Sequence, residues 1–190
     1  MSDPCRIIVI SAPSGSGKTT IYRELLRRNP DLLFSVSFTT RYKREDEVDG
    51  RDYFYVDRAV FEKMAAEGRF VEWASVHGEL YGTERRQIEE CLARGKDCLL
   101  DVDVQGALSV MKAFPGAVTI FIEPPSLEEL ERRLRLRGTE SEEAIRIRLR
   151  NAKKELEYKG HFQYIVVNKR VNESIKAIED IIETERRAGK

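Results

Sequence analysis

The sequence predicts an α/β fold in which helices cover both faces of a five-stranded parallel sheet. Helical patterns separate most of the expected strands, which favours parallel connections. With 190 residues, 41% of them hydrophobic, the chain can form one core with small insertions. Five short apolar segments are expected to be buried strands, and most of them are continuous rather than alternating, which is typical of strands buried on both faces: residues 6–10, 34–38, 98–102, 118–122 and 163–167.

The expected helices are recognised by apolar spacing and by residues that end helices. Each of four helices stops shortly before a glycine or a proline: residues 19–28, 57–67, 83–94 and 105–113. A closing helix carries four isoleucines with the spacing of one core-facing side: Ile175, Ile178, Ile181 and Ile182.

Two stretches interrupt the strand and helix alternation. Residues 37–83 are rich in Tyr, Arg and Asp and contain short strand-like pieces, which indicates an inserted substrate module. Residues 126–154 begin with the capping-box spacing of Ser126 and Glu129, and Gly138 separates two helical patterns, as in a hinged lid. We therefore assign residues 1–36, 84–125 and 155–190 to the core.

A Gly- and Ser-rich run lies between the first strand and the first helix, which is the context of a phosphate-binding loop. Gly15 and Gly17 let backbone N–H groups turn toward a diphosphate, and the helix that follows adds further donors. Ala12 stands where the usual pattern GxxxxGK[ST] has its first Gly. The residues expected at this ATP site are Ala12, Pro13, Ser14, Gly15, Ser16, Gly17, Lys18, Thr19 and Thr20.

The same run predicts a magnesium site. Lys18 would contact the β- and γ-phosphates, and the Thr19 hydroxyl would bind Mg²⁺ that bridges them. Asp101 and Asp103 follow an apolar strand at its carboxyl end, where ligands bind in open α/β sheets. We therefore expect Asp101 to hold Mg²⁺ with Thr19, directly or through water.

The lid segment has a strong local excess of arginine. An arginine carried by a closing lid supplies positive charge to a transferring phosphoryl group. The alternative is a solvated helix face, which suits Arg132 and Arg150 because one helix cannot turn every arginine toward one site. The seven are Arg132, Arg133, Arg135, Arg137, Arg146, Arg148 and Arg150.

Residues 37–83 contain groups suited to a phosphorylated acceptor. Forked donors and phenols match the oxygens of a second phosphate, and they are Arg41, Arg44, Tyr53 and Tyr81. If the acceptor is a nucleotide, Glu72 can accept hydrogen bonds from N1–H and the amine of guanine, while Thr83 donates to O6. Adenine would leave that carboxylate unpaired, so these residues favour guanine.

Composition excludes several other classes. Thirty-three basic and thirty-three acidic residues cancel, which argues against a nucleic-acid binder. No apolar run approaches the ~20 residues of a membrane span, and the three cysteines fit reduced thiols of a cytoplasmic protein. His77 and His161 are isolated, which argues against a zinc site. Without a heptad seam, a monomer and a modest homodimer are equally compatible with the sequence.

The sequence resembles the guanylate kinase family over nearly its whole length. The resemblance implies Mg²⁺-dependent phosphorylation of GMP and dGMP by ATP, on a core with a GMP-binding module (37–83) and a closing lid (126–154). The segments that carry it are residues 11–19, 37–41, 48–53, 70–73, 80–83, 100–106, 124–126, 137–140 and 165–168.

The resemblance also implies roles for single residues. The GMP phosphate would be bound by Ser37, Arg41, Arg44, Tyr53 and Tyr81. The base would be bound by Glu72, Thr83 and Asp103, with Asp101 beside them in the GMP site. The transferring phosphoryl group would be stabilised by Lys18, Arg44, Arg137 and Arg148, with Arg133 assisting. Asn168 would lie near the adenine of ATP.

Two other functions share parts of this pattern. A guanylate-kinase-like scaffold would use the acceptor cleft to hold phosphorylated peptides, but the intact Gly17-Lys18-Thr19 and the arginine-rich lid argue against it. A phosphosugar kinase could use the same phosphate loop, but it would leave the guanine-complementary Glu72 and Thr83 without a ligand.

Overall fold

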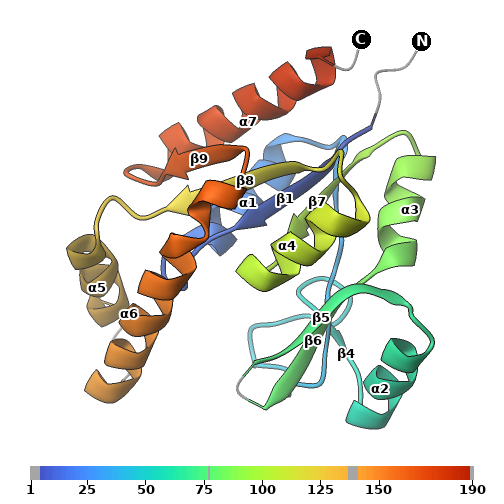
Figure 1. The fold of residues 1–190 in the computed structure, drawn as a ribbon, viewed down its shortest axis with the longest axis horizontal. Coiled ribbons are helices and arrows are strands. Elements are labelled where there is room, and N and C mark those ends of the chain that lie inside the picture. Colours follow the sequence, from blue (N-terminus) through green and yellow to red (C-terminus); the bar gives the residue numbers. More distant parts are fainter. Residues whose placement is uncertain (1–4, 77, 137–140, 189–190) are drawn as a thin grey trace.

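The computed structural model describes residues 5–76, 78–136 and 141–188, and it contains two sheets. The larger sheet confirms the predicted five-stranded parallel core (Figure 1). Its strands, in spatial order, are β2 (Leu32–Phe34), β7 (Asp97–Asp101), β1 (Ile7–Ser11), β8 (Val118–Glu123) and β9 (Tyr164–Val167).

Helices cover both faces of this sheet, which explains why its strands are apolar without alternation. On one face, Ile8 and Ile10 of β1 pack with side chains of α1 (Lys18–Arg28) and α7 (Val171–Ala188). On the other face, Ile7 and Val9 pack with side chains of α3 (Arg85–Ala93) and α4 (Val104–Ala113). Of the four isoleucines expected to face the core, Ile175, Ile178 and Ile182 are buried, and Ile181 packs at the edge.

The second sheet lies within residues 37–84 and is flanked by α2 (Arg58–Ala66) (Figure 1). Phe38 of this sheet stacks on Phe54 and lies edge-on to Phe70, so the sheet has its own aromatic core. Its strands, in spatial order, are β4 (Phe54–Tyr55), β3 (Phe38–Thr39), β6 (Glu79–Glu84) and β5 (Phe70–Val76).

The prediction of one strand over residues 34–38 is wrong, because the chain passes from one sheet to the other there. Phe34 ends β2 and stacks on Tyr22 in the core, whereas Phe38 begins β3. Between them, the backbone N–H of Val36 donates to the side chain of Gln87 at 2.9 Å instead of to a neighbouring strand. The apolar residues alternate with Ser35 and Ser37 as in a single strand, although Phe34 and Phe38 belong to two different cores.

The lid segment forms two packed helices, α5 (Leu127–Leu136) and α6 (Glu142–Glu157), and a short 3-10 turn, η1 (Lys159–His161), follows them. Leu130 and Leu134 of α5 are buried against Ile145 and Ala152 of α6. The Ser126 hydroxyl accepts a hydrogen bond from the Glu129 N–H at 3.1 Å, as the capping spacing predicts. Gly138 and His77 lie outside the described residues.

None of the described helices combines the length and the apolar composition that a membrane span requires. Among the same residues, Cys5, Cys91 and Cys98 are unbridged, in agreement with the expectation of reduced thiols.

Candidate active site

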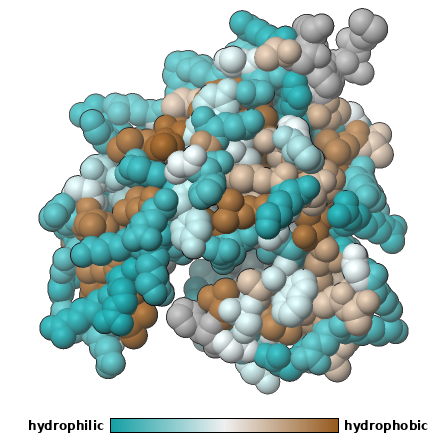
Figure 2. All heavy atoms as spheres, viewed as in Figure 1, coloured by the Kyte–Doolittle hydropathy of each residue, from teal (hydrophilic) through white to brown (hydrophobic). Residues whose placement is uncertain are grey.

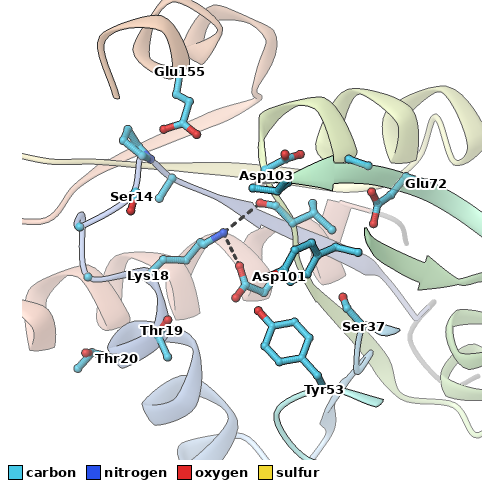
Figure 3. A pocket seen from close by; sticks show the side chains of 18 residues that line it. Ser14, Lys18, Thr19, Thr20, Ser37, Tyr53, Glu72, Asp101, Asp103 and Glu155 are labelled. Carbon is cyan, nitrogen blue, oxygen red and sulfur yellow. Dashed lines mark hydrogen bonds and ion pairs between the residues drawn. The ribbon is translucent and has the colours of Figure 1, made fainter. Parts of the chain in front are cut away.

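A cavity of about 410 Å³ opens at the carboxyl ends of the neighbouring strands β1 and β7. The surface is hollowed between the helices α5 and α6 and the second sheet (Figure 2). Residues from the phosphate loop and from the second sheet line the cavity, together with Glu155 of α6 (Figure 3). Of the nine phosphate-loop residues expected at the ATP site, Ser16 alone does not line the cavity, because it is fully buried.

The phosphate loop has the backbone that its glycines were expected to permit. Gly15 and Gly17 adopt φ values of 91° and 87°, a conformation that other residues rarely tolerate. No side chain caps the start of α1, so its first N–H groups remain available as donors to an anion. A Cβ at Gly15 would lie 2.9 Å from Leu134 of α5, so the lid also packs directly on the loop.

Lys18 and Asp101 form an ion pair inside the cavity (Figure 3). Lys18 Nζ lies 2.5 Å from Asp101 Oδ1 and donates to the carbonyl of Val102 at 3.1 Å. The lysine therefore already points into the space where phosphates would bind, with a carboxylate as its counter-ion.

Oxygen donors for Mg²⁺ are present in the same cavity. The hydroxyl of Thr19 and the carboxylate of Asp101 both line it. The described residues contain no cluster of three or more metal-ligating side chains. Mg²⁺ is usually bound by one or two protein oxygens together with substrate phosphates and water, so this donor set fits it.

Glu72 and Asp103 lie on the cavity wall opposite the phosphate loop (Figure 3). Burial in the wall, together with the nearby charge of Asp103, raises the pKa of Glu72 to about 7. The Thr83 hydroxyl donates to Glu72 Oε1 and does not line the cavity, which differs from its expected donation to guanine O6. Asp103 Oδ1 accepts the N–H of Gly106 at 2.7 Å and caps α4.

Three of the five residues expected at the acceptor phosphate line the cavity, namely Ser37, Tyr53 and Tyr81. Arg41 does not, because Glu47 holds its guanidinium at 2.7 Å. Burial opposes ionisation of Glu47, but hydrogen bonds from Arg41 and its neighbours lower its pKa to about 2. The guanidinium of Arg41 also lies 5.4 Å from the ring centre of Tyr53. An acceptor phosphate would have to replace Glu47 as its partner.

Arg44 is exposed and does not line the cavity either. Its backbone N–H donates to Glu47 at 2.9 Å, so one carboxylate organises both arginines of this loop. The structure thus brings the phenols and Ser37 to the cavity and leaves the two arginines beside it.

The lid places Arg148 at the phosphate loop, where its guanidinium donates to the Ser14 hydroxyl at 3.1 Å. Arg133 donates to Glu129 at 2.8 Å and to the backbone carbonyl of Asn168 at 3.0 Å, outside the cavity lining. Arg132 pairs with Glu129 on the surface, as the alternative of a solvated face predicts. Arg137 lies outside the described residues.

Asn168, which the resemblance places near adenine, lies beneath the phosphate loop. It is buried and does not line the cavity. Its amide donates to the Ser16 carbonyl at 2.7 Å, and its amide oxygen accepts from Ser174 at 3.0 Å. A Cβ at Gly17 would lie 2.7 Å from the same amide nitrogen. Asn168 therefore supports the phosphate loop from beneath.

Comparison with known proteins agrees with this geometry, since the profile of the guanylate kinase family matches residues 4–185. The chain belongs to the guanylate kinase family. A guanylate kinase of Thermotoga maritima is 47% identical over 95% of this chain and 87% of that protein. One of Aromatoleum aromaticum is 48% identical over 94% and 86%, respectively.

A crystal structure of guanylate kinase from Anaplasma phagocytophilum has a similar fold. It superposes with a TM-score of 0.81 at 34% identity and covers 97% of this chain and 87% of that chain. The guanylate kinase relationship therefore holds for the sequence and for the overall fold.

The sequence analysis missed four residues that line the cavity, of which Glu155 is the only charged one; the others are Ala74, Val76 and Val102. Glu155 of α6 lines the cavity, and its Oε2 atom is buried without a hydrogen-bond partner. Burial raises the pKa of this carboxyl group, against a hydrogen bond from the Ser14 backbone that lowers it. The available signal was its position seven residues, or two helical turns, after Arg148.

Proposed function

We propose that the protein transfers the γ-phosphoryl group of ATP to GMP or dGMP and releases ADP with GDP or dGDP. One observation carries the proposal: a phosphate loop and a guanine-complementary carboxylate, Glu72, line the same cavity. The guanylate kinase relatives support it, and none of those described above is a scaffold or a sugar kinase.

The donor half of the site binds ATP through the phosphate loop. Backbone N–H groups at Gly15 and Gly17 and the start of α1 bind the phosphate oxygens. Lys18 exchanges Asp101 for the β- and γ-phosphates. Thr19 and Asp101 hold Mg²⁺, which offsets negative charge on the phosphates when it is bound.

The acceptor half of the site binds GMP. Ser37, Tyr53 and Tyr81 donate hydrogen bonds to its phosphate, which also draws Arg41 and Arg44 inward from Glu47. Glu72 accepts hydrogen bonds from N1–H and the 2-amino group of guanine. Asp103 contributes its second carboxylate oxygen from the start of α4.

Transfer proceeds in line, and catalysis comes from positioning and charge stabilisation. No general base is needed, because a phosphate monoester with a second pKa of ≈ 6 is largely deprotonated at neutral pH. Arg44, Arg137 and Arg148 stabilise the transferring group, and Arg133 ties the lid to the β9–α7 junction. Closure of residues 37–83 and 126–154 excludes water.

A coupled assay tests the proposal by following ADP formation with ATP and Mg²⁺ when GMP, AMP, CMP or UMP is offered separately. Turnover restricted to GMP is the expected result. ATP binding without phosphorylation of any nucleotide contradicts the acceptor assignment, and phosphosugars and phosphopeptides are then offered to the same preparation. A cytoplasmic location is part of the proposal and rests on the unbridged cysteines and on the nucleotide substrates.

A further inference from the structure

Gly106 occupies a position where the backbone itself does not require glycine. It is the third residue of α4, its φ is not in the left-handed range, and it is buried. Glycine inside a helix is unfavourable relative to alanine because it orders a more flexible backbone. A neighbour must therefore account for the missing side chain.

That neighbour is the carboxylate of Glu72. A Cβ on residue 106 would lie 2.9 Å from Glu72 Oε2, 3.1 Å from Glu72 Cδ and 3.1 Å from Val102 Cβ. These distances are shorter than ordinary van der Waals contacts. Thr83 holds the other oxygen, Oε1, and the open side of Glu72 is the cavity. A methyl group on residue 106 would therefore push Oε2 into the space that the base is to occupy.

Gly106 also contacts the second acidic residue of this wall. Its backbone N–H donates to Asp103 Oδ1 at 2.7 Å, which fixes one oxygen of Asp103 and leaves the other beside the cavity. One residue thus sets the position of both carboxylates, through a missing side chain in one case and a backbone donor in the other.

We propose that Gly106 is a positioning residue for guanine selectivity, because its lack of a side chain lets the Glu72 carboxylate rest against the start of α4. The inference rests on the proposed function, in which Glu72 binds the base. Guanine offers two donors on one edge, and both carboxylate oxygens must be placed to meet them. Hydrogen bonds weaken steeply when distance and angle depart from their optimum.

The first experiment compares Gly106→Ala with Gly116→Ala, a glycine that has no atom within 4 Å of its would-be Cβ. Alanine keeps the backbone N–H to Asp103, so the variant tests the steric effect alone. For Gly106→Ala we expect the KM for GMP to rise about tenfold, with kcat and the KM for ATP within about twofold. The preference for GMP over IMP, which lacks the 2-amino group, should fall as well.

Equal changes in the KM values for GMP and ATP, or an unchanged preference for GMP over IMP, would overturn the inference. An inactive parent protein would instead contradict the proposed function. The steric contact between residue 106 and Glu72 would then be tested by thermal unfolding.

The second experiment provides that test without any substrate. In a Glu72→Ala background, which removes the carboxylate, Gly106→Ala should raise Tm by about 2–4 °C through its better helix propensity. In the parent background the same substitution should leave Tm unchanged or lower it. The same Tm shift in both backgrounds would mean that Glu72 and residue 106 do not compete for space, and the inference would fail.

Discussion

The donor and acceptor halves of the cavity are prepared to different degrees. The phosphate loop is contiguous in sequence, and its shape is fixed by positive-φ glycines and by the buried Asn168. The acceptor side is assembled from separate strands, and its side chains already have internal partners, as in the pair Arg41–Glu47. The backbone of the donor half is preformed for an anion, and only the side chain of Lys18 must leave its partner, Asp101. In the acceptor half, the arginine side chains themselves must exchange partners when GMP binds.

The largest effect is expected from Lys18→Met, which removes the side-chain charge of the preformed half. Turnover should fall about 10³-fold or more, because a charge aimed at the transferring group acts in a water-excluded site. Steady-state kinetics measure the loss, and the exposed Lys112→Met is the matched control. A loss below tenfold would mean that the loop's backbone donors suffice for catalysis.

Glu72→Gln tests the acceptor half alone. Its amide keeps the size of the carboxylate but presents an NH₂ group toward one guanine donor, so kcat/KM for GMP should fall about 10²–10³-fold. The KM for ATP should stay within about twofold. Loss of ATP affinity in the same variant would show that the two halves are not independent.

The Glu72→Gln variant should also be more stable than the parent protein at pH 8. The pKa of Glu72 is raised from 4.5 to about 7, so the folded state binds more protons than the unfolded state between these values. The contribution of Glu72 to the free energy of unfolding is therefore fully present below about pH 4.5 and is lost as the pH rises through about 7. Glu72→Gln should therefore gain about 2–3 kcal/mol at pH 8, with little change at pH 4.5, in urea unfolding at both pH values. An equal gain at both pH values would exclude desolvation of the charge as its cause.

The smallest effect is expected from Glu155→Gln, which tests whether a buried negative charge beside the phosphate loop weakens ATP binding. Its buried oxygen faces the phosphate loop, so removal of a negative charge should lower the KM for ATP about two- to fivefold at pH 8. The KM for GMP should not change. A higher KM for ATP would instead mean that the charge of Glu155 helps to hold the loop.

The preformed half could be predicted from sequence because it depends on neighbours along the chain. Gly15, Gly17 and Lys18 specify their own geometry, and the apolar runs of β1 and β7 are unambiguous. The acceptor half was less predictable, since the partnership of Arg41 with Glu47 depends on a folded loop.

The features that the sequence did not reveal also depend on contacts between residues far apart in the chain. Residues 34–38 were assigned to one strand because their apolar side chains do not reveal that Phe34 and Phe38 belong to different sheets. The contacts of the Asn168 amide with the phosphate loop and with Ser174 join residues far apart in sequence, and its place near adenine stays a prediction. Glu155 follows Arg148 by two helical turns, but this spacing does not by itself show that the shared face of α6 meets a cavity.

The amide of Asn168 joins two parts of the chain that the ribosome makes far apart in time. Ser16 is synthesised early, and the residue that supports its carbonyl follows 152 positions later. Until β9 has emerged and paired with β8, the loop lacks that support. A nascent chain therefore carries its ATP signature for 152 residues of synthesis before it can complete the supported loop, so the capacity to hold nucleotide is acquired only after β9 has emerged.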